Sequence, residues 1–361
     1  MRRLAVALAI LAGCTSEPRA TPAAPPTDGR TTASIPASPS PSPSAGSRYL
    51  VAAGDIACAP GEAVTRTTCH QRRTAELLEH GGPLSDPLAV LLLGDVQYES
   101  GTTSEFRSFD ATWGRALERS GAIVLPVTGN HEYAATGPAP PGCRLTWAGH
   151  HACGFAEYFA GRTNLLEDGD VQYAVTFDAA QPHPLHVIVL DVGACDWDTS
   201  RCGGDGPVVR FLRRALADRR ANPPAACTIV AWHQARWSDL GHGDLAWVDP
   251  VWRALFSVPP ARRPDLVLNG HDHVYERFHP LGVDGSPRSD GIPEIVAGPG
   301  GRDIAGVPSW FLSGSDRLAE IEPMSFGVVE VAWNPSTPEL TTRFVGEDGA
   351  GRDRSVHPCH V

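Results

Sequence analysis

The chain has 361 residues and a formal net charge of −11, so it lacks the basic balance that attracts nucleic acid or an anionic membrane. When an N-terminal segment is set aside, about 310 residues remain, which suffices for one large domain or two small ones. The 37 glycines and 33 prolines indicate long loops. An anionic substrate would need a local positive site, which bound metal ions can supply.

The first residues have the pattern of an export signal. Arg2 and Arg3 precede the apolar run Leu4–Ala12, which is too short for a bilayer-spanning helix, since that takes about 20 residues. The run leads into Leu-Ala-Gly-Cys, which resembles the bacterial lipobox. We therefore predict a lipoprotein signal peptide over residues 1–13 and a lipid on Cys14, so that the protein is exported and either anchored to the outer face of the bacterial membrane or secreted. A plain signal peptide with an incidental cysteine is the alternative.

Residues 14–47 are dominated by Pro, Ser, Thr and Ala. Such a segment cannot bury a core, so we predict a disordered tether. Fully extended at about 3.1 Å per residue, it would reach at most roughly 100 Å. The catalytic domain is expected to follow over residues 48–361.

Nine cysteines occur in the chain, and eight remain without Cys14. In an exported protein an even number of cysteines favours disulfides. Local bridges are plausible at Cys58–Cys69, Cys143–Cys153 and Cys195–Cys202, and Cys227–Cys359 would then tie the C-terminus to a core strand. The sequence alone does not fix this pairing.

From residue 48 onward, short apolar runs alternate with helical patterns, which predicts an α/β domain. The predicted buried strands are Tyr49–Ala53, Ala89–Leu93, Ile123–Val127, His186–Leu190, Thr228–Ala231 and Leu266–Leu268. The predicted helices are Val64–His80, Glu105–Glu118, Pro207–Arg220 and Asp244–Phe256. Later strands with little helix between them suggest a second, more antiparallel sheet packed on the first. These are Ile292–Ala297, Gly327–Trp333 and Leu340–Val345.

Polar side chains follow five of these strands at the point where each strand ends. Because ligands bind at the carboxyl ends of strands in α/β sheets, we expect these side chains to meet at one edge. They are Asp55, Asp95 with Tyr98, Asn130 with His131, His233, and His271 with His273.

Carboxylate, amide and imidazole groups in this combination suit a site for two metal ions such as Zn, Mn or Fe. A single Gly-Asp or a single histidine would be weak evidence, because both are common in turns and cores. Gly-Asn-His-Glu fixes four positions and arises by chance on the order of once in several hundred chains of this length. The ordered series at strand ends therefore predicts a metal centre.

The series Gly-Asp, Gly-Asp-x-x-Tyr, Gly-Asn-His-Glu, His and Gly-His-x-His resembles the calcineurin-like metallophosphoesterases, and within them most closely the purple acid phosphatase type. The resemblance covers most of residues 48–346. It implies a two-sheet β-sandwich flanked by helices, with a dinuclear metal centre. It also implies that the first metal takes Asp55, Asp95, Tyr98 and His273. The second metal would take Asp95, Asn130, His233 and His271, with Asp95 bridging the two ions.

One position departs from the family pattern. Many relatives have Gly-Asp-x-His at the first motif, and that histidine is a ligand, but here Ala57 stands in its place. The phenolate of Tyr98 would fill the vacancy, and as a hard anionic ligand it favours Fe(III), beside Zn, Mn or Fe(II) as the second ion. The alternative for Tyr98 is a packed aromatic residue near the site.

By the same resemblance, His131 would contact the phosphate and assist the leaving group. His242, nine residues after His233, is the candidate for a second substrate histidine, although the residues around it differ from the family's. Arg236 is either a phosphate contact or a surface arginine. His150 and His151 either line the entrance to the site or are solvated loop residues.

These features predict an extracytoplasmic, acid-phosphatase-like phosphomonoesterase, in which a metal-bound hydroxide attacks the phosphorus of a phosphorylated small molecule. A phosphodiesterase or nucleotidase on the same centre is an alternative, as is a catalytically silent surface-binding lipoprotein. A nuclease is disfavoured, because the chain lacks a basic stripe. The substrate and the oligomeric state are not specified by the sequence.

Overall fold

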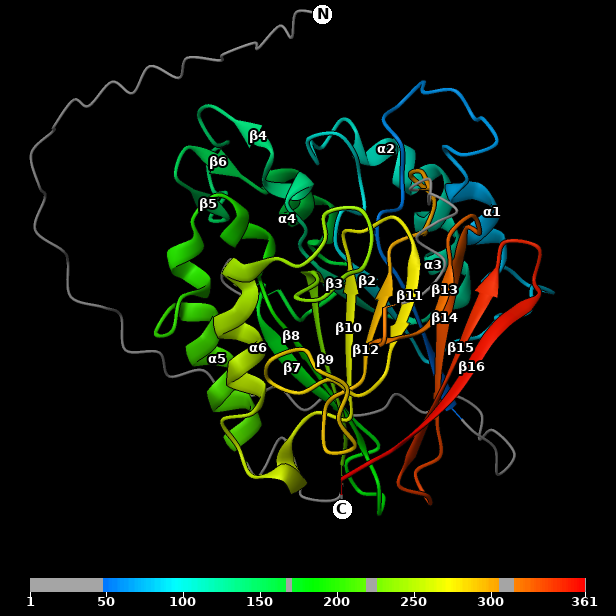
Figure 1. Cartoon of the computed structure of the whole chain (residues 1–361). Coiled ribbons are helices and arrows are strands. Elements are labelled where there is room, and N and C mark those ends of the chain that lie inside the picture. Colours follow the sequence, from blue (N-terminus) through cyan, green and yellow to red (C-terminus); the bar gives the residue numbers. More distant parts are fainter. Residues whose placement is uncertain (1–47, 167–170, 219–225, 305–314, 361) are drawn as a thin grey trace, which may run out of the picture. The chain divides into compact units, whose positions relative to one another are not determined.

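Two mixed β-sheets packed face to face form the centre of the fold (Figure 1). The computed structural model describes residues 48–166, 171–218, 226–304 and 315–360, so the predicted signal peptide and tether lie outside the described residues. The first sheet has the order β16 (Gly351–Pro358), β15 (Glu339–Gly346), β14 (Gly327–Trp333), β1 (Arg48–Ala53), β2 (Ala89–Leu93) and β3 (Ile123–Val127). The second has the order β13 (Leu318–Glu322), β11 (Tyr275–Phe278), β12 (Glu294–Ala297), β10 (Leu266–Gly270), β9 (Cys227–Gln234), β8 (Leu185–Val189) and β7 (Tyr173–Phe177).

The strands that precede the predicted ligands are parallel within each sheet. In the first sheet β1, β2 and β3 are parallel, and in the second β8, β9, β10 and β12 are parallel. The central strands read as continuous apolar runs because both of their faces are covered, one by the opposite sheet and the other by helices. Their carboxyl ends therefore open at one end of the sandwich.

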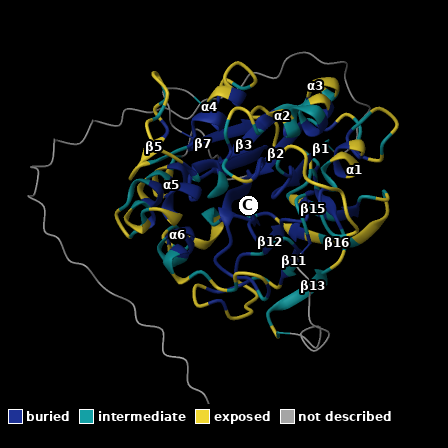
Figure 2. Cartoon of the chain, turned by 90° about the horizontal axis from the view of Figure 1, so that it is seen from above, coloured by how far each residue is buried: buried dark blue, intermediate teal, exposed yellow. Residues whose placement is uncertain are grey.

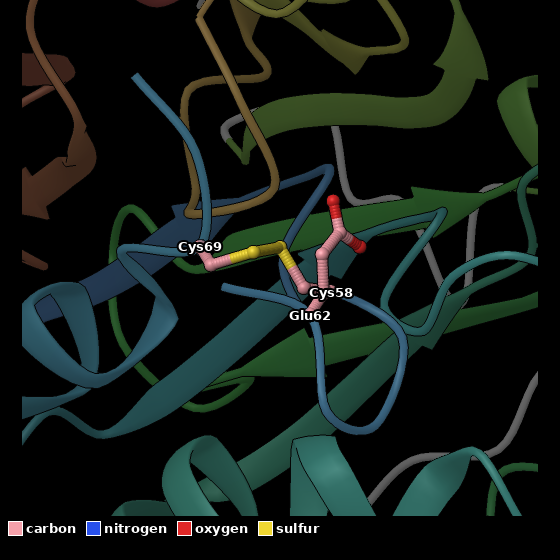
Figure 3. Close-up of side chains that lie close together, drawn as sticks. All are labelled: Cys58, Glu62 and Cys69. Atoms are coloured by element: carbon pink, nitrogen blue, oxygen red, sulfur yellow. A yellow bond between two sulfur atoms is a disulfide. The ribbon is translucent and has the colours of Figure 1, made fainter. Parts of the chain in front are cut away.

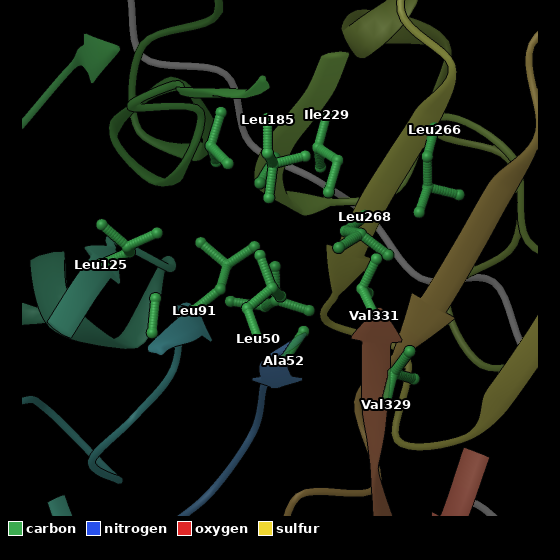
Figure 4. Packing of buried hydrophobic residues seen from close by; sticks show 14 of the residues in the cluster. Leu50, Ala52, Leu91, Leu125, Leu185, Ile229, Leu266, Leu268, Val329 and Val331 are labelled. Carbon is green, nitrogen blue, oxygen red and sulfur yellow. The ribbon is translucent and has the colours of Figure 1, made fainter. Parts of the chain in front are cut away.

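The main core lies between the two sheets. Figure 4 shows Leu50 and Leu91 of the first sheet in the same apolar layer as Ile229 and Leu268 of the second. A second cluster packs the outer face of the first sheet against the helices within residues 71–159, and a third packs the outer face of the second sheet against the helices within residues 207–255. Seen from above, exposed residues lie mainly on the outer loops and helices (Figure 2).

The first helix is shorter than the sequence predicts. In place of the helix expected over Val64–His80, only α1 (Gln71–Glu76) forms, because the preceding segment is a loop closed by a disulfide, with Cys69 at φ 64°. The helix expected over Glu105–Glu118 is confirmed as a continuous stretch whose middle is a π-turn. Its parts are α2 (Phe106–Phe109), η1 (Asp110–Gly114) and α3 (Arg115–Ser120).

The two later helices are confirmed with shifted ends. One is α5 (Pro207–Ala217), and the last residues of its predicted range lie outside the described residues. The other, expected from Asp244, begins as the short helix η6 (Ala246–Val248) and continues as α6 (Asp249–Leu255). Pro250 at the second position of α6 suits the first turn of a helix, where no N–H donor is needed.

The assignment of later strands to a separate antiparallel sheet was wrong. β14 pairs antiparallel with β1, so β14 to β16 extend the first sheet, whereas β12 joins the second sheet beside β10. The sequence also missed a small helix and three short strands in the segment after β3. These are α4 (Cys153–Phe159), β4 (Ala135–Thr136), β5 (Thr146–Trp147) and β6 (His150–His151).

All four plausible disulfides are present, namely Cys58–Cys69, Cys143–Cys153, Cys195–Cys202 and Cys227–Cys359. The last joins β9 to the end of the chain across 132 residues. None of the described helices is both long and apolar enough to span a bilayer.

Candidate metal centre

The predicted ligands leave their strands on strained backbone. Asp55, Asp95 and His271 have φ values of 58°, 46° and 76°, in the left-handed region that residues with a side chain rarely adopt. Strain of this kind costs of order 1–3 kcal/mol per residue and persists where surrounding contacts enforce it. Three such residues at neighbouring strand ends indicate a functional site.

The first group of side chains gathers around the phenol of Tyr98. Its oxygen lies 2.8 Å from Oδ1 of Asp55, 3.1 Å from Oδ2 of Asp95 and 3.0 Å from Nε2 of His273. His273 Nε2 in turn lies 3.4 Å from Oδ1 of Asp55. Four potential metal donors thus converge on one small volume, and they are those of the first predicted ligand set.

The second group adjoins the first through Asp95. Nε2 of His233 lies 3.1 Å from Oδ2 of Asp95, and donor atoms of Asp95, His233 and His271 all lie within 4.8 Å of one another. Asn130 adjoins this group along the chain: the backbone N–H of the next residue, His131, donates to Oδ1 of Asp95 at 2.8 Å, and Oδ1 of Asn130 accepts a hydrogen bond from Nε2 of Gln234 at 3.3 Å. The sheet ends therefore bring together six of the seven side chains that the sequence singled out as ligands, and the seventh, Asn130, lies on an adjoining loop.

The acidic groups dominate the electrostatics of His233 and His273, whereas burial and the charge of His233 lower the pKa of His271. Burial alone would lower the pKa of His233, but the carboxylates of Asp95 and Asp55 outweigh it and raise that pKa to about 9. Burial also opposes protonation of His273, yet the hydrogen bonds that it donates to Asp303 and Asp55 raise its pKa to about 10. The cluster thus attracts positive charge.

The donor set fits metal ions by a second criterion. His233 is fully buried, and its Nδ1 lies 2.8 Å from the carbonyl oxygen of Leu93, which turns Nε2 toward the two aspartates. That Nε2 lies 3.1 Å from Oδ2 of Asp95 but forms no hydrogen bond with it or with any other described residue. A buried imidazole that is oriented by one nitrogen and leaves the other without a hydrogen bond is the arrangement of a metal-ligating histidine.

Two glycines make room for this packing. A Cβ atom on Gly94, which has φ 89°, would lie 2.6 Å from Nδ1 of His233, and one on Gly129 would lie 2.1 Å from Oδ1 of Asp95. Neither clash can be relieved without moving a predicted ligand. The glycines before these motifs are therefore required for close approach as well as for the turn.

His131 and His242 each contact a predicted ligand. His131 lies beside the first group, with its ring 4.3 Å from that of Tyr98 and its Nε2 3.9 Å from Oδ2 of Asp95. His242 is exposed and stacks on His271 with ring centroids 4.1 Å apart. Both predicted substrate histidines are therefore at the site.

Arg236 is neither of the alternatives that the sequence left open. It is only 9% exposed, and its guanidinium packs on Trp237 and pairs with Asp249 at 3.4 Å. An arginine whose charge is committed to a carboxylate and a ring has a structural role.

Two supporting carboxylates were missed. Glu132 is fully buried and accepts backbone hydrogen bonds from residues 95, 96, 97 and 129, so it ties the second and third ligand loops together. Asp303 accepts a hydrogen bond from Nδ1 of His273. The Glu of Gly-Asn-His-Glu was a visible signal for the first, whereas no local pattern marks Asp303.

A second cluster of metal-ligand residue types is not a metal site. Cys58, Cys69 and Glu62 lie close together (Figure 3), but the two sulfur atoms share a disulfide bond. The carboxylate of Glu62 pairs with Arg302 at 2.8 Å. Neither thiolate is available to an ion.

The chain is similar to known proteins in sequence and in fold. Residues 50–275 match the family model of the calcineurin-like phosphoesterases. Uncharacterized proteins from two strains of Mycobacterium tuberculosis are 27% identical over 215 residues, which cover 57% of this chain and 38% of theirs; the match thus spans well under half the length of these relatives. A purple acid phosphatase from yellow lupin (Lupinus luteus) seeds superposes with a TM-score of 0.63 at 18% identity, over 87% of this chain and 54% of that one. At that identity the likeness is one of fold.

Proposed function

The chain belongs to the calcineurin-like phosphoesterase family, and from that premise we propose that it hydrolyses phosphomonoesters at a two-metal centre. The observation that carries the proposal is the sharing of Asp95. Its Oδ2 lies 3.1 Å from the Tyr98 oxygen on one side and 3.1 Å from Nε2 of His233 on the other. A carboxylate in that position belongs to both donor groups, as a bridging ligand must.

Two sets of residues would hold the ions. The first set is Asp55, Asp95, Tyr98 and His273, and the second is Asp95, Asn130, His233 and His271. When bound, the ions would supply positive charge that neutralises phosphate oxygens and activates water. The formal charge of −11 does not oppose an anionic substrate, because the charge near the ions dominates the cleft.

We assign proton transfer to the leaving group to His131. Its Nδ1 lies 2.6 Å from the backbone carbonyl of Glu99, so Nδ1 donates that hydrogen bond and Nε2 carries the second proton when the ring is charged. The side chain is 29% exposed, which leaves Nε2 open to a substrate. His242, exposed beside His271, is proposed to contact phosphate oxygens.

We assign the first ion as Fe(III), with Zn, Mn or Fe(II) as the second. The support is the position of Tyr98, whose oxygen lies among three other donors where relatives use a histidine that Ala57 replaces. Burial and the charges of Asp55 and Asp95 raise the pKa of this phenol, so a strongly acidic ion is the partner that suits its phenolate form.

Metal content and substrate preference test the proposed function together. The purified protein is expected to hold two ions per chain and to hydrolyse 4-nitrophenyl phosphate faster than bis(4-nitrophenyl) phosphate. Asp95→Ala should lose ions of both groups and all turnover, whereas Asp290→Ala, which alters an exposed surface ion pair, should change neither. Faster cleavage of the diester would reassign the enzyme as a phosphodiesterase, and less than one ion per chain without turnover would favour a binding protein.

We also propose that the protein acts outside the cytoplasm, held by a lipid on Cys14. Four disulfides suit an oxidising compartment. Mass spectrometry of the membrane fraction should find a mature chain that begins with a lipidated Cys14, and Cys14→Ser should remove it from that fraction. An unmodified N-terminus in a membrane-free fraction would contradict the anchor.

A further inference from the structure

Beside the metal centre, two disulfide-closed loops meet and expose aromatic rings. Six large apolar side chains are exposed in the described part of the chain, and two of them, Trp147 at 37% and Trp197 at 39%, lie here. One loop is closed by Cys143–Cys153 and the other by Cys195–Cys202. Exposed tryptophan is costly in water, so two in one place indicate a surface that binds something.

Each ring is fixed by contacts with neighbouring side chains. Nε1 of Trp147 donates to Oδ2 of Asp198 at 2.8 Å, and the guanidinium of Arg201 lies 4.5 Å from the Trp147 ring centre. Arg201 is itself fixed by an ion pair of 2.9 Å with buried Asp191. The Trp197 ring stacks on His150 at 3.9 Å. Rings fixed in this way lose little freedom when a ligand stacks on them.

Two of the rings, those of Trp147 and His150, border a pocket of suitable size, and Trp197 stacks on His150. Trp147 and His150 face each other in the register of β5 and β6. The pocket has a volume of about 390 Å³, and its other lining residues are Gly137, Ala139, Thr146, Ala148, Gly149 and His151. Pockets that bind small molecules have volumes of about 300–1,000 Å³. The pocket can therefore hold one planar ring system.

The same rings are close to the reacting centre. Nδ1 of His150 lies 3.2 Å from the carbonyl oxygen of Tyr133, and Tyr133 belongs to the short helix η2 (His131–Tyr133) that carries the proposed proton donor. Because two residues of chain span at most about 8 Å, the Cα atoms of Tyr133 and His131 lie no farther apart than that. On the other loop, burial and the charge of Asp95 raise the pKa of Asp196, the neighbour of Trp197.

We propose that Trp147, Trp197 and His150 form a leaving-group subsite, in which the planar aromatic part of the substrate stacks while its phosphate lies at the metal centre. This rests on the proposed function. A nucleobase and an aryl group share the required chemistry, since both present a flat face to an indole ring. The subsite therefore selects aromatic over aliphatic phosphate esters.

Binding of phosphonates tests the subsite without turnover, because a carbon–phosphorus bond replaces the bond that is hydrolysed. The probes are methylphosphonate, phenylphosphonate and a phosphonate analogue of adenosine monophosphate, measured by calorimetry on the metal-loaded protein. At least one aromatic probe should bind about tenfold more tightly than methylphosphonate. Which of the two gains more distinguishes an aryl ester from a nucleotide.

Variants locate the preference. Trp147→Ala and Trp197→Ala should each reduce it by about three- to tenfold, Trp147→Phe should keep most of it, and Val356→Ala, at an exposed site on β16, should keep all of it. An aromatic preference that is absent, or that survives both alanine variants, overturns the subsite. The same preparations are also assayed with 4-nitrophenyl phosphate. If they do not hydrolyse it but keep the aromatic preference, the result counts against the proposed function alone.

Discussion

The phenolic oxygen of Tyr98 lies 2.8 Å from Oδ1 of Asp55, although 43 residues separate them in the chain. Ala57, on the same loop as Asp55, has no side-chain atom that can bind a metal ion. The loop after β2 thus brings a phenol into the donor group at the end of β1.

Tyr98→Phe should remove the visible absorption of the iron-loaded protein. A phenolate bound to Fe(III) absorbs visible light by charge transfer, and the variant lacks the phenolate oxygen while keeping the ring that packs against His131. The visible spectrum of each protein after iron loading is the measurement. A colourless, active enzyme that contains only zinc or manganese would refute the assignment of iron.

Asp303→Asn should lower metal affinity by about 10- to 100-fold, the usual cost of removing a carboxylate that orients a ligating histidine. Asp303 fixes the ring of His273 through Nδ1, and the amide cannot supply the same negative charge. Affinity is measured by competition with a metal chelator, so turnover is not needed. Asp290→Asn serves as the matched control on the surface. Equal affinities in Asp303→Asn and the wild type would show that His273 needs no such support.

Glu132→Gln should destabilise the metal-free protein by about 3 kcal/mol. The carboxylate of Glu132 accepts four backbone hydrogen bonds through two oxygens in a fully buried place, whereas the amide has one oxygen and turns two N–H donors toward other donors. Urea denaturation of the metal-free protein measures the change. Glu157→Gln, at an exposed glutamate, should shift the free energy of unfolding by less than about 0.5 kcal/mol. A similarly small shift for Glu132→Gln would mean that water or another group accepts the hydrogen bonds of these four backbone N–H groups.

His186 should make the protein less stable in acid. Burial lowers its pKa to about 4, although the charge of Asp218 acts in the opposite direction, while in the unfolded chain the pKa is about 6.5. The unfolded state therefore binds the proton first as pH falls. The stabilisation that depends on neutral His186 is complete above about pH 6.5 and is lost between about pH 6.5 and 4. At about pH 5 the free energy of unfolding is lower by about 2 kcal/mol for this reason.

His186→Gln should keep a hydrogen-bonding group beside Thr176, the present partner of Nδ1, and remove the titration. Its free energy of unfolding should then fall by about 2 kcal/mol less than that of the wild type between about pH 7 and 5. His279→Gln, at an exposed histidine, is the control for the loss of an imidazole. Parallel pH curves for His186→Gln and the wild type would show that the ring finds a partner for its charge.

Local patterns determined much of this protein. The central strands could be predicted because strands covered on both faces must be apolar throughout, and the ligand residues because each follows such a strand directly. Asp55, Asp95 and His271 are thus marked by their neighbours in the chain, as is the glycine that precedes each of them. The same kind of proximity made the disulfide pairs within short loops plausible, and the structure fixed the pairing.

Only the tertiary structure decided which distant segments meet. Nothing local in β14 makes it pair with β1, and nothing near Asp303 marks it as the partner of His273, 30 residues away. Likewise, no local pattern relates Trp147 to Trp197, and they come together only because the two disulfide-closed loops that carry them meet. Residue type and short spacing specify which groups a strand end presents, but the packing of two sheets and their loops determines which groups support and surround them.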